Sequence, residues 1–234
     1  MRRFHFKHFS LNHEKSTMKV GTDSVLLGAW MTVKPTDVVL DIGTGCGVLS
    51  LMAAQKGAAK IDAVDIDEPS IYEAAANFEA SCWRDQLAAY HADVRRFGLG
   101  RRYDLILSNP PFFIHSSQCD ADRKSQTRHS EASLSFNDLV VTVKHLMKPE
   151  GRFVLVLPER ESKEFITISN KNNLYIHKVL NIIPIENQET NRVNLELAYG
   201  KPERVEESFL VLRHPDGEFT KAYYDFVKDF YLGS

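Results

Sequence analysis

A loop with three glycines, placed between an apolar run and a helix-like pattern, constrains the fold most. Residues 38–42 (VVLDI) form a short apolar run typical of a buried strand, and glycines follow at positions 43, 45 and 47. Residues 48–55 then have the apolar content of a helix that packs against a sheet. Strand, glycine loop and helix in this order are typical of the βαβ unit whose loop binds a nucleotide-like ligand. The sequence therefore predicts a ligand site at this loop.

The same alternation of strands and helices continues along the chain. We expect further strands at 61–66, 87–91, 103–108 and 153–157, and helices at 70–80 and 136–147. Such alternation predicts a parallel sheet covered by helices on both faces. The second part of the chain differs: a helix at 161–170 is followed by three β-rich runs without helices between them (175–185, 193–199 and 208–213) and by an aromatic-rich helix at 220–232. These runs predict an antiparallel edge on the sheet.

The elements together predict one α/β domain over residues 1–234, with a Rossmann-like, mostly parallel sheet of seven or more strands. A length of 234 residues is above the typical domain length of roughly 150, and it favours one large domain. Within it we expect a basic N-terminal arm (1–21), a core that holds the ligand and the chemistry (38–158), and a sheet edge with the C-terminal helix (159–234).

Composition and charge narrow the class of protein. The chain has 43% hydrophobic and 26% charged residues, which is ordinary for a globular protein, and a formal net charge of −2. Taken alone, this balance favours a small-molecule enzyme over a nucleic-acid-binding protein. Cys46, Cys82 and Cys119 are scattered, so we expect neither a disulfide framework nor a metal site. No secretory signal and no membrane-spanning run is visible, so we expect a cytoplasmic protein.

The spacing of the glycine loop indicates a positively charged cofactor. A dinucleotide fingerprint requires a glycine at position 48, which is Val48, and the loop follows the pattern D-x-G-x-G-x-G instead. Asp41, at the mouth of the loop, would repel a pyrophosphate but suits a ligand with an ammonium and a sulfonium group. S-adenosylmethionine (SAM) has both. The sequence therefore predicts a SAM site and disfavours an NAD-dependent oxidoreductase.

Two further carboxylates follow the next strands of the predicted sheet. Asp65 ends the second strand, where such folds hold the ribose hydroxyls, and Asp93 follows the third, where it can accept a hydrogen bond from the adenine amino group. A single Asp at a strand end is more often a turn or cap residue, and we interpret Asp67 in that way. Acidic residues at three successive strand ends favour the cofactor site.

The segment Asn109-Pro110-Pro111-Phe112 stands at the end of the fourth strand and predicts a clamp for a planar amine. The Asn109 side-chain oxygen and the Pro110 carbonyl can accept both hydrogens of an NH₂ group, while Pro111 stiffens the turn and Phe112 offers a stacking face. Such positioning can contribute several kcal/mol to catalysis. The alternative is a rigid turn, since Asn-Pro and Pro-Pro are common in loops.

The motifs DIGTGCG and SNPPF, in this order and separation, resemble the class I SAM-dependent methyltransferases that modify planar amino groups. The segments FKHF at 6–9 and MKVGTDSVLLGAW at 18–30, with the tail at 222–232, are similar to the bacterial tRNA1(Val) (adenine-37-N6)-methyltransferase family over essentially the whole chain. The resemblance implies methylation of the adenosine at position 37 in the tRNA anticodon loop.

The resemblance also implies roles for individual residues. Asn109, Pro110, Pro111 and Phe112 would clamp the acceptor, and Asn109 would also touch the cofactor. The methionine part of SAM would contact Asp41, Gly43, Gly45 and Gly47, with Asp65 on the ribose and Asp93 on the adenine. Residues 21–23, with Thr22, would fold over the amino-acid end of SAM, and the alternative for Thr22 and Asp23 is a helix cap alone. We expect a monomer without a metal.

Other acceptors remain possible at this point. Release-factor glutamine N5-methyltransferases usually have a helical domain ahead of the glycine loop, for which residues 1–37 leave no room. Ribosomal RNA guanine N2-methyltransferases are often larger, with a duplicated domain, and DNA adenine methyltransferases usually carry a separate recognition domain. A non-catalytic SAM-binding RNA chaperone is disfavoured by the complete amine clamp.

Local charge gives a more specific prediction than net charge. Residues 1–19 hold five basic side chains and one acid, with phenylalanines at 4, 6 and 9. Basic side chains bind the phosphates of RNA loops, and aromatic side chains stack on their splayed bases. The alternative for the phenylalanines is packing in the core. The residues expected to contact RNA are Lys7, Lys19, Arg123, Lys124 and Arg128. Residues 61–79 hold six acids and no Lys or Arg, which suggests a separate, acidic cofactor side.

Overall fold

The computed structural model describes residues 3–16, 19–110 and 134–231. The elements in its first half are β1 (Phe4–His5), β2 (Ser10–Leu11), α1 (Thr22–Trp30), β3 (Val38–Ile42), α2 (Val48–Gln55), β4 (Lys60–Asp65), α3 (Glu68–Glu79), β5 (Leu87–His91) and β6 (Tyr103–Ser108). Those in its second half are α4 (Phe136–Leu146), β7 (Met147–Pro158), α5 (Glu159–Lys171), β8 (Leu174–Ile185), β9 (Arg192–Tyr199), β10 (Glu206–Arg213) and α6 (Lys221–Val227). Two short 3₁₀ helices, η1 (Arg84–Gln86) and η2 (Val94–Arg96), flank β5.

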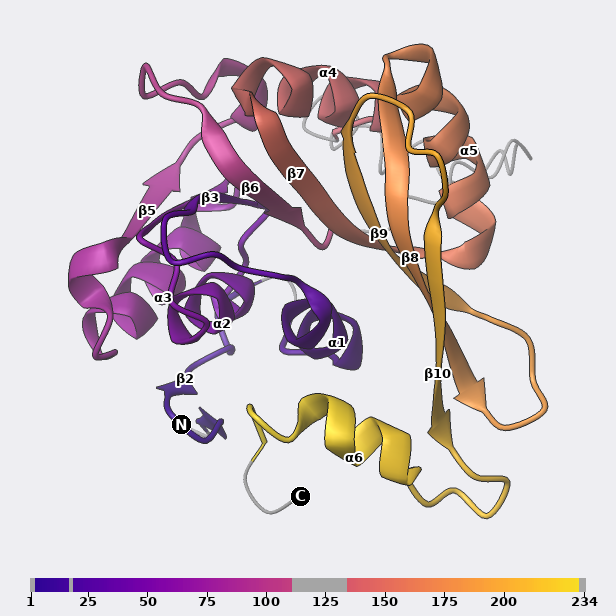
Figure 1. The fold of residues 1–234 in the computed structure, drawn as a ribbon. Coiled ribbons are helices and arrows are strands. Elements are labelled where there is room, and N and C mark those ends of the chain that lie inside the picture. Colours follow the sequence, from indigo (N-terminus) through magenta and orange to yellow (C-terminus); the bar gives the residue numbers. More distant parts are fainter. Residues whose placement is uncertain (1–2, 17–18, 111–133, 232–234) are drawn as a thin grey trace, which may run out of the picture.

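Eight strands of the described residues form one sheet in the order β10-β8-β9-β7-β6-β3-β4-β5. Helices α1, α2 and α3 cover one face, and α4 and α5 cover the other (Figure 1). The predicted α/β fold with a mostly parallel sheet is confirmed. Only β9 among these strands runs against its neighbours, between β7 and β8, whereas the edge strand β10 is parallel to β8. The antiparallel pairing that the sequence predicts at the sheet edge is therefore made by one strand, β9, which lies inside the sheet.

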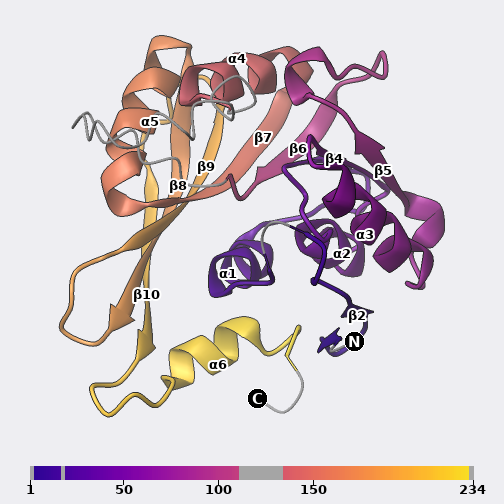
Figure 2. The same ribbon diagram turned by 180° about the vertical axis from the view of Figure 1, so that it is seen from behind.

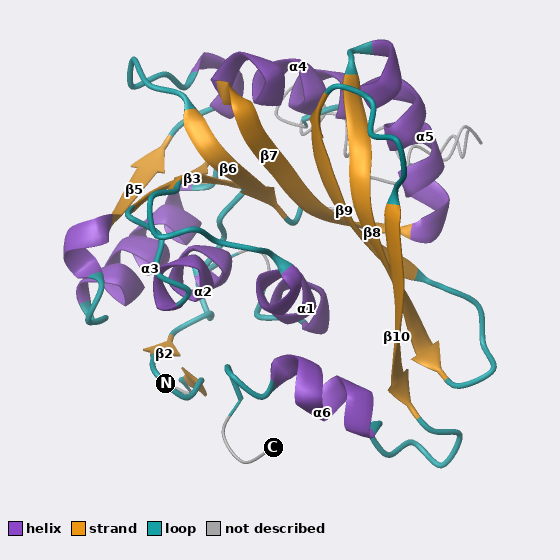
Figure 3. Cartoon of the chain, in the orientation of Figure 1, coloured by secondary structure: helices purple, strands orange, loops and turns teal. Residues whose placement is uncertain are grey.

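Most element bounds lie within one or two residues of those that the sequence patterns predict. The exceptions are the N-terminal hairpin, the start of β7 and the end of α6, which stops at Val227 and not at residue 232. The patterns do not predict the small hairpin of β1 and β2, and β7 begins at Met147, where they predict a turn before residue 153 (Figure 3). Met147 pairs with Tyr103 ahead of an irregularity in the register, so the chain enters the sheet earlier than its composition indicates.

The strands supply side chains to two cores because alternate residues point to opposite faces. Val39 packs under α1–α3, whereas its neighbour Leu40 packs under α4 and α5, and both are fully buried. Each such side chain contributes about 1.5–3 kcal/mol when it is removed from water. The near-continuous apolar strands of the sequence follow from this two-sided burial.

The two ends of the described chain pack against each other. The ring of Phe6 stacks on Phe9 at 4.5 Å between centroids and on Tyr231 at 5.8 Å. The backbone N–H of Lys7 donates to the carbonyl of Phe230 at 2.8 Å. Both views of the ribbon show the N-terminal hairpin beside the segment that follows α6 (Figures 1 and 2). Phe6 and Phe9 are buried, so core packing is the correct alternative for them.

Gly47 allows α3 to approach the glycine loop closely. It precedes α2 with a φ of 85°, in the left-handed region that favours glycine. A Cβ at this position would overlap the ring of Phe78 on α3. Gly57, just after α2, has a φ of 94° but open space around its Cα. The two positions therefore differ in steric contact and share the backbone requirement.

We predict that Gly47→Ala lowers the free energy of unfolding by about 2–4 kcal/mol, because it adds a steric overlap of about 1–3 kcal/mol to the cost of a strained backbone of about 1 kcal/mol. Gly57→Ala should cost only the backbone part. Chemical denaturation of both variants measures the difference. Equal losses would show that the Phe78 contact contributes nothing.

Candidate cofactor and acceptor site

A pocket opens at the C-terminal ends of β3 and β6, where open α/β sheets bind their ligands. Its lining combines the glycine loop, the first residues of α2, one residue each from α1 and the segment before it, and the residue after β6: Lys19, Ser24, Gly43, Thr44, Gly45, Cys46, Val48, Leu49 and Asn109. Four of the residues predicted for cofactor, acceptor or RNA therefore meet here. Thr22, Asp41, Gly47, Asp65 and Asp93 do not belong to the lining.

The glycine loop is attached to the end of β4 through its backbone. The N–H groups of Gly43 and Thr44 donate to the carbonyl of Val64 at 2.8 and 3.2 Å. The N–H of Gly45 donates to Asp65 Oδ2 at 2.9 Å. Because three glycines in the loop have positive φ angles, their backbones can turn tightly and leave room beside the loop for a ligand.

Asp41 lies beneath this loop and not at its mouth, where we expected it. Its side chain has no exposed surface. Oδ2 accepts hydrogen bonds from the hydroxyls of Thr44 and Ser50, both at 2.7 Å, while Oδ1 has no hydrogen-bond partner among the described residues. Burial raises the pKa of Asp41 to about 6. Asp41 thus ties the loop to α2 and places a buried acid next to the pocket.

Asp65 and Asp93 stand at the ends of β4 and β5 as predicted, with different partners. Asp65 accepts one backbone N–H on each oxygen, from Gly45 at 2.9 Å and from Asp67 at 3.0 Å, and burial raises its pKa. A carboxylate with two such bonds can still accept two hydroxyls. Asp93 is held by the Arg95 side chain at 2.6 Å, and this bond lowers its pKa.

Helix caps around the site correct one alternative and confirm another. The side chain of Asp67 accepts the N–H of Ser70 at 3.0 Å and caps α3, as predicted. Helix α1 begins at Thr22, and its cap is Gly21 without a side-chain hydrogen bond. The alternative that Thr22 or Asp23 caps this helix is therefore wrong.

Asn109 lines the pocket, and its side-chain carbonyl is without a hydrogen-bond partner among the described residues. The side chain is 8% exposed, and its Nδ2 donates to Ser24 Oγ at 2.8 Å. Its Oδ1 is buried and has no hydrogen-bond partner within the described ranges. A buried carbonyl without a partner lowers the stability of the fold by about 1–3 kcal/mol, so a bound ligand that donates a hydrogen bond to it would be favoured. Pro110 follows half-buried, whereas Pro111, Phe112, Arg123, Lys124 and Arg128 lie outside the described residues.

Helix α3 holds part of the N-terminal arm by its backbone. The Glu73 carboxylate accepts the backbone N–H groups of residues 14, 15 and 16 at 2.9–3.0 Å. Asn77 exchanges two bonds with the backbone of Asn12 at 2.8 Å and donates to the Cys46 carbonyl of the glycine loop at 2.9 Å. Sequence reasoning missed both residues, because polar side chains four apart on a helix also occur on any solvated face.

The acidic stretch at 61–79 is in part structural. Asp62 is fully buried and pairs with Arg101 at 3.0 Å and with the Tyr103 hydroxyl at 2.9 Å. The Glu73 carboxylate accepts backbone N–H groups of the N-terminal arm.

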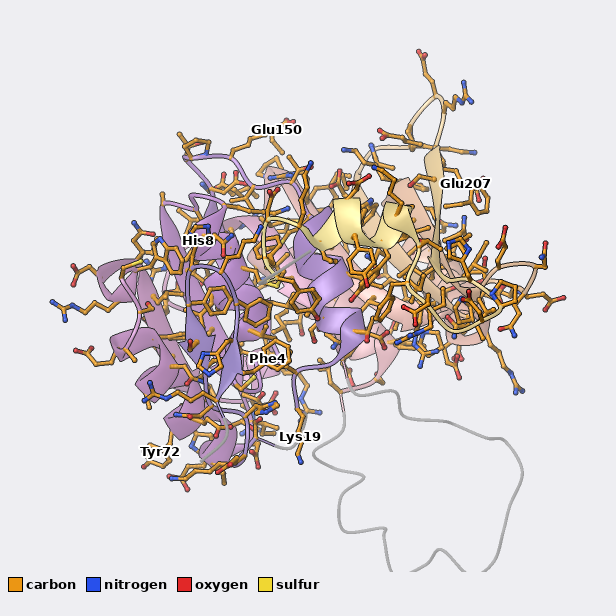
Figure 4. All side chains as sticks on the ribbon, turned by 90° about the horizontal axis from the view of Figure 1, so that it is seen from below. Phe4, His8, Lys19, Tyr72, Glu150 and Glu207 are labelled. Carbon is orange, nitrogen blue, oxygen red and sulfur yellow. The ribbon has the colours of Figure 1, made fainter. Side chains whose placement is uncertain are left out.

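The lysines of the N-terminal arm that are predicted to contact RNA lie at the surface. Figure 4 shows the side chain of Lys19 extending away from the protein, whereas Phe4 lies among other side chains. Lys7 is exposed, and its Nζ donates to the carbonyl of Lys228.

Comparison with known proteins decides the family. The model of the Methyltransferase small domain matches residues 14–166. A tRNA1(Val) (adenine(37)-N6)-methyltransferase from Pectobacterium carotovorum is 37% identical over 98% of this chain and 93% of its own length. Its counterpart from Flavobacterium psychrophilum is 36% identical over 98% and 99%. The chain belongs to the tRNA1(Val) (adenine(37)-N6)-methyltransferase family.

Solved structures of methyltransferases share the fold of this family member. A predicted O-methyltransferase from Agrobacterium tumefaciens superposes with a TM-score of 0.66 over 89% of this chain and 96% of its own, at 17% identity. The T. thermophilus 16S rRNA N2 G1207 methyltransferase in complex with AdoMet and guanosine gives a TM-score of 0.59 at 21% identity, over 85% of this chain and 50% of that one. These likenesses support the class I methyltransferase fold.

No group of three or more His, Cys, Asp or Glu side chains within the described residues is arranged to hold a metal ion. Among the helices of the described ranges, none has both the length and the apolar character that crossing a membrane requires.

The raised pKa of Asp41 predicts a pH dependence of stability. Between the ordinary value of 3.8 and about 6 the folded protein holds a proton that the unfolded chain has lost, so the contribution of Asp41 falls by roughly 1.4 kcal/mol for each pH unit over this range. Asp41→Asn retains an oxygen for Thr44 and Ser50 but does not titrate. The unfolding free energy of wild type minus that of the variant should fall as pH rises from 4 to about 6 and then remain constant. A difference independent of pH would contradict the raised pKa.

Proposed function

We propose that the protein transfers the methyl group of SAM to N6 of adenosine 37 in the anticodon loop of tRNA(Val). The observation that supports this chemistry is that Asn109, which lines the pocket beside the glycine loop, has a buried Oδ1 without a hydrogen-bond partner in the described part of the chain. The relatives that match over nearly their whole length are named for this activity, and the substrate in our proposal is taken from those names. The proposal includes a monomer, because one chain provides both the cofactor loop and the clamp, and a location in the cytoplasm, where tRNA is found.

The residues that line and surround the pocket fit SAM. We assign its methionine part to Gly43, Gly45 and Gly47 of the loop, with Asp41 beneath and Thr22 at the start of α1, its ribose to Asp65 and its adenine to Asp93. The tight backbone turns, the remaining acceptor capacity of Asp65 and the buried acid all suit a positively charged nucleoside. When bound, SAM supplies a methyl group on a sulfonium that makes it open to attack by an amine.

The clamp prepares the acceptor for that attack. We assign one N–H of the adenine amino group to Asn109 Oδ1 and the other to the Pro110 carbonyl, with Pro111 and Phe112 completing the clamp as the sequence motif predicts. Two acceptors draw the planar nitrogen toward a tetrahedral geometry and direct its lone pair at the methyl group. The nitrogen loses a proton easily once it is methylated, so no strong base is required.

A target in an anticodon loop suits this site. The adenine must leave its stack to enter the clamp, which costs a few kcal/mol and least for an unpaired base. Lys7, Lys19, Arg123, Lys124 and Arg128 remain our assignments for contacts to the RNA backbone. Lys19 is the one that stands on the pocket lining within the described chain.

The direct test supplies labelled SAM to the wild-type protein with unmodified tRNA and, separately, with release factor. We expect label in tRNA and N6-methyladenosine after digestion to nucleosides. N2-methylguanosine would favour the ribosomal-type alternative, and label in the release factor alone would favour the glutamine N5 alternative. No transfer combined with intact SAM binding would favour a non-catalytic binding protein.

We predict that Asn109→Ala lowers the single-turnover rate on tRNA by at least roughly 100-fold, because several kcal/mol of acceptor positioning are lost. The affinity for S-adenosylhomocysteine, measured by calorimetry, should fall far less. Asn170→Ala, at an exposed position of α5, is the matched control and should leave both unchanged. A full rate in Asn109→Ala would contradict the clamp.

We predict that Lys19→Ala weakens tRNA binding and makes the slope of log affinity against log salt shallower by about 0.7–0.9, the value for one lost phosphate contact. Lys34→Ala is the control, since Lys34 is exposed in the loop before β3. This loop lies at the N-terminal end of the strand, whereas the pocket lies at its C-terminal end. Loss of S-adenosylhomocysteine affinity without loss of tRNA affinity would instead assign Lys19 to the cofactor.

A further inference from the structure

We propose that Ser24 is a positioning residue for Asn109: its hydroxyl holds the amide nitrogen and so directs the carbonyl oxygen at the acceptor amine. The inference rests on the proposed function and extends it to a residue of α1 that the amine-clamp motif does not contain. Ser24 and Asn109 are 85 residues apart in the sequence and meet only in the folded chain.

The contact between the two side chains is direct and buried. Asn109 Nδ2 lies 2.8 Å from Ser24 Oγ, and both residues line the pocket. Ser24 is 6% exposed and Asn109 8%. The two ends of a carboxamide have nearly the same shape but opposite hydrogen-bonding character. A partner for one end therefore decides which character the other end presents, and Oδ1 is the end without a partner among residues 3–16, 19–110 and 134–231.

Helix α1 is held firmly enough for this task. Asp23, next to Ser24, pairs with Arg192 at the start of β9 at 3.0 Å between Oδ2 and Nε. Further along, Gly28 lies so close to α2 that a Cβ there would overlap the thioether of Met52. Leu26 and Leu27 are fully buried. The first turn of α1 is thus fixed to β9 on one side and to Asn109 on the other.

Loss of the Ser24 hydroxyl removes the hydrogen-bond acceptor of the Asn109 amide nitrogen. A buried N–H that loses its partner carries the full cost of desolvation. The carboxamide therefore rotates to a position in which its N–H groups can donate to another acceptor. Rotation removes Oδ1 from the amine and lowers the rate of the chemical step. It leaves the glycine loop, Asp41 and Asp65 in place, so the cofactor still binds.

The first experiment observes the hydrogen bond without any assay of activity. In a ¹⁵N–¹H spectrum of the full chain, the Asn109 side-chain NH₂ signals are identified by their absence from Asn109→Ala. We expect them to be protected from exchange with solvent in wild type and to exchange rapidly in Ser24→Ala. Unchanged signals in Ser24→Ala would overturn the proposal, whether or not the protein methylates tRNA.

The second experiment measures single-turnover methylation of tRNA. We expect Ser24→Ala to be roughly tenfold slower, with unchanged affinity for S-adenosylhomocysteine and unchanged KM for tRNA. Ser24→Cys keeps the volume and a weak acceptor, so its rate should be intermediate. Ser169→Ala, which removes a fully buried hydroxyl that donates to the Ile166 carbonyl of its own helix, is the matched control and should react at the wild-type rate.

A double variant separates positioning from a general loss of structure. If Ser24 acts through Asn109, adding Ser24→Ala to Asn109→Ala should cause no further loss of rate. The same tenfold loss in both backgrounds, or a loss confined to KM or cofactor affinity, would overturn the proposal. Absence of any transfer by the wild-type protein would instead refute the proposed function and leave the spectroscopic result to decide the hydrogen bond.

Discussion

The buried carboxylate of Asp41 is the interaction on which the site depends. It accepts hydroxyls from Thr44 in the glycine loop and from Ser50 in α2, both at 2.7 Å. A loop rich in glycine has little conformational preference of its own, so its shape must come from such bonds. With the loop attached to β4 as well, its backbone keeps one conformation, and α2 and α3 can pack closely against it.

Segments far apart in the sequence complete the pocket around this loop. The end of β6 contributes Asn109, α1 contributes Ser24, and the N-terminal arm contributes Lys19. Glu73 and Asn77 of α3 hold the arm by its backbone, and Asn77 also bonds to the glycine loop. One helix therefore links the cofactor loop to the arm, so the two parts of the pocket are positioned together.

The acidic side chains of the chain have different partners, which its net charge of −2 does not reveal. Within the acidic stretch at 61–79, Asp62 is neutralised by Arg101 in the core, and Glu73 is committed to backbone N–H groups. Only part of that charge is thus available to a ligand. Asp93, similarly, is paired with Arg95. Whether a carboxylate faces a cofactor, a cation or the backbone depends on neighbours that composition does not reveal.

The amino-acid sequence by itself determined the fold class, the bounds of most strands and helices, and the strand ends at which the pocket lies. These properties follow from local patterns: apolar runs bury strands on both faces, and glycines with Asn-Pro-Pro end strands at one edge of the sheet. The residues outside these patterns, such as β1 and β2, were not predictable because their order comes from contacts with the C-terminal segment.

Only the tertiary structure decided the orientation and partners of the polar side chains. It placed Asp41 beneath the loop, buried Phe6 and Phe9 in the core, and brought Ser24 to Asn109. A hydrogen bond acts over about 3 Å, so its partner is set by which elements pack together and not by spacing along the chain. For this reason the sequence indicated an amine clamp, whereas the fold supplied the residue that holds it in place.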